Sequence, residues 1–194
     1  MLLPYCAKPF TNPFGKGKPL IRGNQYHKAV RMETCISNNS YMPKEQTKEL
    51  IKFLKPFNKD IQEIALWLRE FVWDLYPDCN ELIYDNYNAV AVGWSPTDKV
   101  GDTFCSIAIG TNKYVHFGFY WGSRIADPEK ILLGNGNQYR YITVKDRAEF
   151  PKTYIKKLLK EAYAYSLGKM KEKKQVLKGS TIVKSISPVK RRPK

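Results

Sequence analysis

The spacing of apolar residues changes twice along the chain, and the changes predict helices, then strands, then a helix. Between residues 43 and 78, apolar positions recur every three or four residues in two stretches separated by Pro56, a spacing typical of amphipathic helices. The period then becomes two, which predicts strands. A last helical pattern has Pro151 in its first turn and Gly168 after its end. The predicted strands cover 81–87, 89–94, 103–110, 114–121 and 138–144, and the last helix covers 149–167.

This order of elements predicts an α+β fold. Strands that are grouped together between helices favour a two-layer sandwich, in which an antiparallel sheet of four to six strands carries the helices on one face. The second helix should begin after Asn58, whose side chain is suited to cap it. Its apolar residues fall on one broad face, which should point to the core.

Charge divides the chain into a neutral centre and two basic ends. The 194 residues carry a formal net charge of +15. Residues 1–31 hold six Lys or Arg and no acid, and residues 168–194 hold ten with one acid, whereas 32–167 is balanced. We therefore expect one domain over 42–168. It should lie between a basic, mostly disordered extension over 1–41 and a basic, flexible tail over 169–194.

Composition indicates a cytoplasmic protein that neither crosses a membrane nor carries out catalysis. No apolar run approaches the roughly 18 residues of a membrane helix, and the start of the chain lacks the pattern of a secretory signal. The four cysteines are scattered without a C-x-x-C pair, which favours free thiols. His116 is the only histidine in the expected domain, and no nucleophile motif accompanies it. We therefore predict a non-enzymatic protein.

Residues 134–136, Gly-Asn-Gly, are a weak candidate for a phosphate loop. The dinucleotide-binding pattern fails at Tyr139, where a third glycine would stand. A strand is predicted next, where a phosphate loop requires a helix. A turn before that strand is the better interpretation.

Alternation along the strand at 114–121 predicts one apolar face and one open face. The side chains of Val115, Phe117 and Phe119 should meet the helices, because neighbouring residues of a strand point to opposite faces. The open face would carry a titratable group among tyrosines, and we predict a ligand-binding or partner-docking surface there; the alternative is a purely structural histidine. The predicted ligand-binding residues are Tyr114, His116, Tyr120 and Arg140.

Four carboxylates follow one flank of the second predicted helix at spacings of three, seven and four residues. Such a stripe can collect cations through oxygen ligands, or it can be a solvated face. The basic tail likewise has two interpretations: a solubilising end, or a segment that contacts nucleic acid weakly and without sequence preference. The predicted metal ligands are Asp60, Glu63, Glu70 and Asp74.

The segment 116–140 resembles the YdhG-like family of small bacterial proteins, mostly catalogued as a domain of unknown function. The resemblance is carried by His116, Gly118 and Gly122, by Asp127-Pro128, by the run 133–136 and by Arg140, and it extends over roughly 57–167. It implies a frataxin-like sandwich and, from one branch of the family, an iron chaperone that docks a partner protein. Iron is accordingly the expected cofactor or cargo. The family motif does not include the carboxylate stripe, whose link to iron is an analogy at the level of the fold.

Overall fold

A six-stranded mixed sheet and three helices make up the domain in the computed structural model, which describes residues 48–170 and 179–193. The predicted extension over 1–41 lies outside these residues. Helices α1 (Lys48–Leu54) and α2 (Lys59–Leu75) come first, and α3 (Lys152–Lys169) follows the fifth strand. The strands are β1 (Asn80–Asp85), β2 (Val90–Ser95), β3 (Cys105–Ile109), β4 (Val115–Tyr120), β5 (Tyr139–Val144) and β6 (Thr181–Ile186), with short 3-10 turns η1 (Val100–Asp102) and η2 (Gly122–Arg124).

Local signals place the long helices where the sequence predicts them. The side chain of Asn58 accepts a hydrogen bond from the amide of Ile61, so Asn58 caps α2 as expected. Pro151 precedes α3, but the helix continues through Gly168 to Lys169. Glycine therefore weakens the last turn without ending the helix there.

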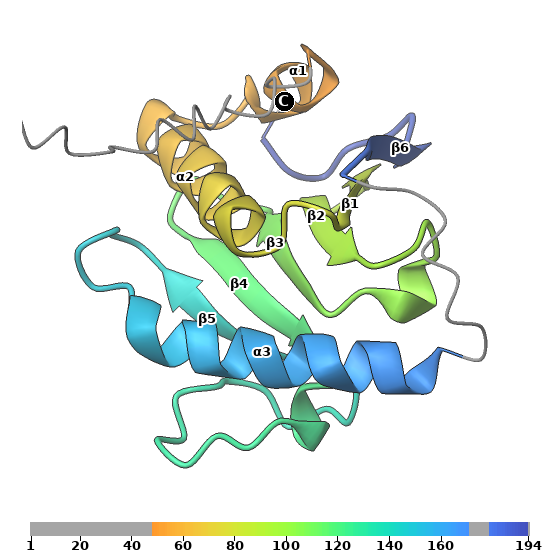
Figure 1. Cartoon of the computed structure of the whole chain (residues 1–194). Helices are drawn as coiled ribbons and strands as arrows, with labels where there is room; N and C mark the ends of the chain where they lie inside the picture. The colour runs from red at the N-terminus through yellow and green to blue at the C-terminus, as the bar shows by residue number, and fades with distance from the viewer. Residues whose placement is uncertain (1–47, 171–178, 194) are drawn as a thin grey trace, which may run out of the picture. The chain divides into compact units, whose positions relative to one another are not determined.

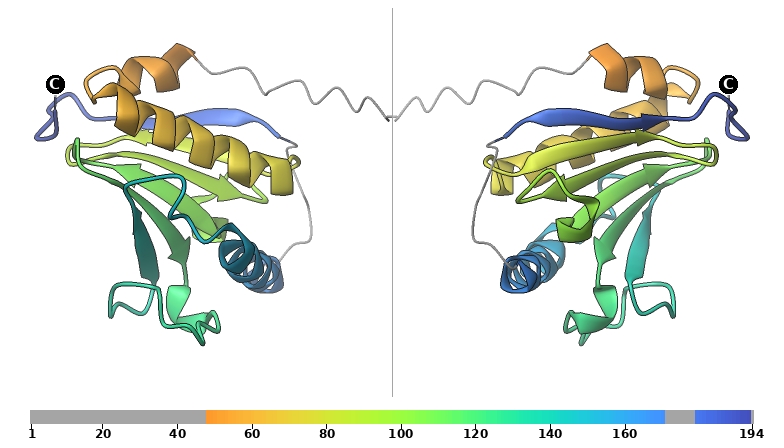
Figure 2. Two further views of the ribbon diagram at one scale, coloured as in Figure 1. Left: turned by 90° about the vertical axis from the view of Figure 1, so that its left-hand side faces the viewer. Right: turned by 90° about the vertical axis from the view of Figure 1, so that its right-hand side faces the viewer.

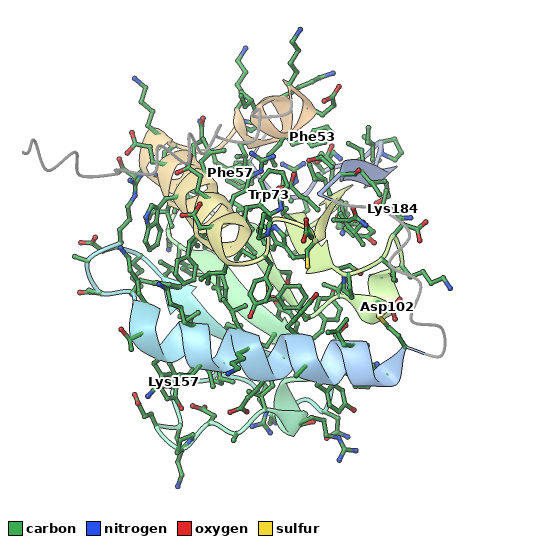
Figure 3. The ribbon with its side chains drawn as sticks, in the orientation of Figure 1. Phe53, Phe57, Trp73, Asp102, Lys157 and Lys184 are labelled. Atoms are coloured by element: carbon green, nitrogen blue, oxygen red, sulfur yellow. The ribbon has the colours of Figure 1, made fainter. Side chains whose placement is uncertain are left out.

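The two long helices cover one face of the sheet, and the α+β prediction is confirmed. Figure 1 shows α2 and α3 in front of the central strands, and the side views of Figure 2 place both on the same side of the sheet. Between the layers lie the apolar side chains of β2, β3 and β4, together with Leu68 and Val72 of α2 and Leu159 of α3. Phe57 and Trp73, labelled in Figure 3, belong to this core. Burial of so many large apolar side chains is the main stabilising contribution.

The first five strands form an antiparallel meander, but the sheet as a whole is mixed. The strand order is β5-β4-β3-β2-β1-β6, and β6 runs parallel to β1 (Figure 2). The prediction of a purely antiparallel sheet is therefore wrong at one edge. The prediction of a flexible tail over 169–194 is also wrong where β6 forms, at 181–186, because this segment completes the sheet; residues 171–178 lie outside the described residues.

A buried ion pair joins the sheet to α2. Arg69 donates from Nε and Nη2 to the two carboxylate oxygens of Glu81, at 2.5 and 2.8 Å, and both side chains are at most 3% exposed. The guanidinium of Arg69 also lies over the ring of Trp73, 4.3 Å from its centroid. This bidentate geometry pairs both charges in the protein interior, where a single unpaired charge would strongly destabilise the fold.

Candidate functional site

Five partly exposed aromatic rings form a row on the face of the sheet opposite α2 and α3. Two of the rings lie in β4, one lies just before it, and two lie in β5. The strand register sets Tyr120 opposite Tyr139 and Gly118 opposite Tyr141. The predicted open-face residues of β4 are thus brought together with two tyrosines of the neighbouring strand. We call this row the ring array; it consists of Tyr114, His116, Tyr120, Tyr139 and Tyr141.

His116 lies between two tyrosine rings of the array. The ring of Tyr114 stacks on it with centroids 4.9 Å apart and an interplanar angle of 14°, and the ring of Tyr141 lies 4.2 Å away at 31°. The register places these tyrosines on opposite sides of His116 along the strand. Both faces of the imidazole are therefore covered, so a ligand would reach His116 through the edge of its ring.

Tyr139 lies across β4 and fixes the other end of the array. Its hydroxyl is 3.1 Å from Oγ of Ser106 on β3, so the side chain reaches over one whole strand. It crosses at Gly118, where a Cβ atom would overlap the phenol ring. Tyr120 meets the ring of Tyr139 edge-on at 5.6 Å. A glycine at 118 is what allows this crossing.

Burial favours the neutral forms of His116, Tyr120 and Tyr139 in the ring array. Burial lowers the pKa of His116 below its ordinary value of 6.5, because removing water disfavours the charged imidazolium. Burial likewise raises the pKa of Tyr120 and raises the pKa of Tyr139 to about 12. The array therefore offers neutral hydrogen-bonding groups set among aromatic carbon, a combination common in sites that bind organic ligands.

Arg140 does not belong to the ring array, and its predicted place on the open face is wrong. It pairs in register with Phe119, whose side chain points to the core, so the alternation of β5 directs Arg140 away from His116. Arg140 instead interacts electrostatically with Asp127, which lies in the turn before β5. Burial alone would raise the pKa of Asp127, but hydrogen bonds from the Tyr154 hydroxyl and two backbone amides, together with the charge of Arg140, lower it.

The turn around Asp127 is held by its own carboxylate. The backbone amides of Ile131 and Leu132 donate to it at 3.3 and 2.9 Å, and the hydroxyl of Tyr154 donates at 2.7 Å. The turn then returns the chain to β5, where Leu133 and Tyr141 exchange two backbone hydrogen bonds. This part of the Gly-Asn-Gly region is thus a structural turn that feeds a strand, as the sequence predicts.

The carboxylate stripe of α2 is exposed and lies beside basic side chains of α3 and of the segment that precedes it. Glu63 pairs with Arg147 at 3.4 Å. Glu70 and Asp74 line a cavity of about 260 Å³ whose other wall includes Lys152 and Lys156. In the described part of the chain, no three His, Cys, Asp or Glu side chains come close enough together to hold a metal ion. The fourth carboxylate, Asp60, is exposed in the first turn of α2.

Neither a protein-family model, nor a curated protein, nor a solved structure matches this chain. Within residues 48–170 and 179–193, no helix is long and apolar enough to cross a membrane. Of the four cysteines, Cys79 and Cys105 lie in the described residues, and both are buried. The function must therefore be argued from the geometry of the domain itself.

Three residues of the site were not predicted from the sequence: Tyr139, Tyr141 and Ser106. The alternating pattern of 138–144 indicates that both tyrosines share one face. It does not indicate their partner strand, because an 18-residue connection separates β5 from β4. The register between the two strands is a tertiary property; it pairs Tyr141 with Gly118 and so brings the Tyr141 ring against His116.

Proposed function

We propose that the domain is a non-enzymatic binding module whose ring array takes an uncharged, hydrogen-bonding ligand, either a small molecule or a peptide segment of a partner protein. The observation that supports this most strongly is the stacked, partly exposed His116 with a lowered pKa. An imidazole that stays neutral can both donate and accept a hydrogen bond through its ring edge. Tyrosine hydroxyls on either side add further donors and acceptors.

The ring array favours a neutral ligand over a phosphate. No cationic side chain contributes to the pKa shift of His116, which burial alone explains. A phosphate ligand would need basic groups to balance its charge. Amides, carbonyls and hydroxyls match the array better, because tyrosine and neutral histidine can bind them without a change of protonation state.

Nuclear magnetic resonance can test this proposal with a library of neutral amides, polyols and short peptides. We expect shifts concentrated on His116 and on the tyrosines of the array. Replacing Tyr114→Ala removes the outer ring of the stack and should weaken binding at least tenfold. Tyr87→Ala is the matched control, since Tyr87 is an exposed tyrosine in the turn between β1 and β2. Equal binding by both variants, or a silent array across the library, would contradict the proposal.

Weak iron or divalent-metal binding is a second candidate function, supported by the resemblance and by the exposed carboxylates of α2. The positive charge around the carboxylates argues against metal binding. Glu63 already pairs with Arg147, and the cavity that Glu70 and Asp74 line also has Lys152 and Lys156 in its wall. Calorimetry with Fe(II) would compare the native chain with a variant in which all four carboxylates of the stripe are replaced by amides. Loss of binding in the variant supports a metal site, and identical weak heats refute it.

Nucleic-acid contact through the tail is the remaining hypothesis. Lys190 and Arg192 are engaged with Asp85, so part of the tail's positive charge is already neutralised within the domain. Any residual binding should weaken steeply as salt is added.

A further inference from the structure

Residues 179–193, which we call the C-terminal segment, lie along the outer edge of β1 in the manner of a bound peptide. Backbone hydrogen bonds extend beyond the parallel ladder of β6 in both directions. Gly179 donates to the carbonyl of Asp78 at 3.1 Å, Ser187 donates to that of Asp85 at 2.8 Å, and Arg191 donates to that of Tyr87 at 2.9 Å. The whole segment, and not only its strand, is therefore attached to the β1 edge.

The first side-chain anchor of the segment lies at its beginning. The hydroxyl of Thr181 donates to Oε2 of Glu81 at 2.8 Å, the same carboxylate that binds Arg69. The amide of Ser180 donates to the side-chain oxygen of Asn80 at 3.1 Å. These contacts fix the register of the segment against β1 at one end.

The second anchor is a buried carboxylate that takes two cations from the segment. Asp85 is 4% exposed. Lys190 approaches its carboxylate at 2.8 Å, and Arg192, which is 7% exposed, donates to it as well. The guanidinium of Arg192 also lies 5.6 Å from the ring centroid of Phe57. Charge-assisted bonds of this kind give a buried edge strong selectivity for basic side chains.

Apolar burial contributes little to this docking. Val183 is 37% exposed, Ile186 is 61% exposed and Val189 is 62% exposed. Lys184, labelled in Figure 3, reaches from β6 to the carbonyl of Asp98 at 3.0 Å. A segment held by a backbone ladder and a few selective side-chain contacts has the chemistry of strand addition to a sheet edge, a common mode of peptide recognition.

We propose that the outer edge of β1 is a docking site for an extended basic segment, which residues 179–193 fill within their own chain and which the same residues of a second copy can fill between chains. Glu81 and Asn80 bind the start of the segment, and Asp85 binds the two cations of its Lys-x-Arg sequence, residues 190 and 192. This site is independent of the ring array, because β1 and β4 are separated by two strands.

Tethering explains why the chain's own segment occupies the site at low protein concentration. A short tether gives an effective concentration in the millimolar range. If the free segment binds with a dissociation constant of about 1 μM, its own site is about a thousandfold more often occupied than empty. Exchange with a second copy, or with an added peptide, then requires that the tethered segment be weakened.

The test uses the full chain and a labelled peptide with the sequence of residues 179–193. In the chain variant Lys190→Gln/Arg192→Gln, the tethered segment no longer forms ion pairs with Asp85. The labelled peptide should therefore bind this variant at least tenfold more tightly than it binds the native chain. A peptide carrying Arg192→Gln should bind this variant at least tenfold more weakly than the native peptide. The matched control is a peptide with Arg191→Gln, which loses the same charge at an exposed position and should bind normally.

Fluorescence anisotropy distinguishes the outcomes. Equal affinity for the Arg192→Gln and Arg191→Gln peptides, or no peptide binding by a variant that keeps its native circular dichroism, would overturn the proposal. If the variant does not fold, amide hydrogen exchange on the native chain decides instead. Faster exchange of the β6 amides than of the β2–β3 amides supports a displaceable segment, and identical rates make β6 an inseparable part of the fold and refute the proposal.

Discussion

Gly118 shows how a single missing side chain shapes the candidate site. The Tyr139 ring lies where a Cβ atom at 118 would be, and its hydroxyl continues to Ser106. Any larger residue must displace that ring. Such a residue would crowd the sheet and break the hydrogen bond between Tyr139 and Ser106. It should therefore lower the stability of the domain and also disorder the ring array.

Replacing Gly118→Ala should lower the free energy of unfolding by about 1–3 kcal/mol, the usual range for forcing extra atoms into a packed site. Gly101→Ala is the control, because a Cβ there meets nothing within 4 Å; its effect should stay within about 0.5 kcal/mol. Urea titration measures both. Equal stability of the two variants would show that Tyr139 moves aside at no cost.

His116 should make the domain less stable in acid. Its pKa in the folded chain is lowered below 6.5 by burial. As the pH falls, the unfolded chain binds the proton first, so the stability due to neutral His116 is present above its unfolded pKa and is lost as the pH falls through the folded pKa. We expect its carbon-bound ring proton to titrate with a midpoint below 6.5. The chain has two histidines, and His116→Gln assigns the signal; a midpoint at or above 6.5 contradicts the burial argument.

At the scale of elements, the buried pair of Arg69 and Glu81 joins α2 to β1 and reaches the start of β6 through Thr181. Both side chains are nearly inaccessible to water. Glu81 would be left as an uncompensated charge if its partner were removed, even though one hydroxyl would still donate to it.

Arg69→Met should therefore cost about 3–5 kcal/mol of folding free energy, the usual penalty for breaking a buried pair from one side. Arg147→Met is the matched control, because Arg147 forms an exposed pair with Glu63 and should cost less than about 1 kcal/mol. Chemical denaturation of both variants checks this. A difference below about 1 kcal/mol would mean that water reaches Glu81.

The elements show how far sequence patterns alone can predict this fold. Period and capping residues located α2, α3 and the five strands of the meander to within a few residues, since each signal is local. The alternation of side chains correctly puts His116 and Phe117 on opposite faces of the sheet. By the same rule it puts Arg140 on the face opposite Tyr139, contrary to the prediction that Arg140 lies on the open face. Strand β6 was missed because its β-branched run of Thr181, Ile182 and Val183 is embedded in a lysine-rich end. Its anchor, Asp85, lies 107 residues from Arg192, and no local pattern encodes such a pair.

At the scale of the whole molecule, the chain closes its sheet with its last strand. β1 is the first strand in sequence, yet it lies inside the sheet because β6 covers its outer edge. An uncovered edge strand would present unpaired backbone groups to other chains. The C-terminal segment thus completes the domain and at the same time neutralises the buried acid of β1.

This dual role predicts that the effect of Asp85→Asn depends on the C-terminal segment. In the full chain the substitution leaves Lys190 and Arg192 without their carboxylate, and it should cost about 3–5 kcal/mol. In a chain that ends at residue 178, those cations are absent and Asp85 is exposed to water, so the same substitution should cost less than about 1 kcal/mol. The difference between the two costs is the coupling energy between Asp85 and the segment.

Asp78→Asn provides the control for this cycle, since Asp78 is exposed and its backbone carbonyl accepts a hydrogen bond from Gly179 that the substitution leaves in place. Its effect should be small and equal in the long and short chains. Urea titrations of the six proteins yield both differences. Equal costs of Asp85→Asn in the two backgrounds would show that Asp85 contributes to the fold independently of the segment. The edge of β1 would then hold β6 through its backbone ladder alone, without the charge selectivity that the Asp85 contacts indicate.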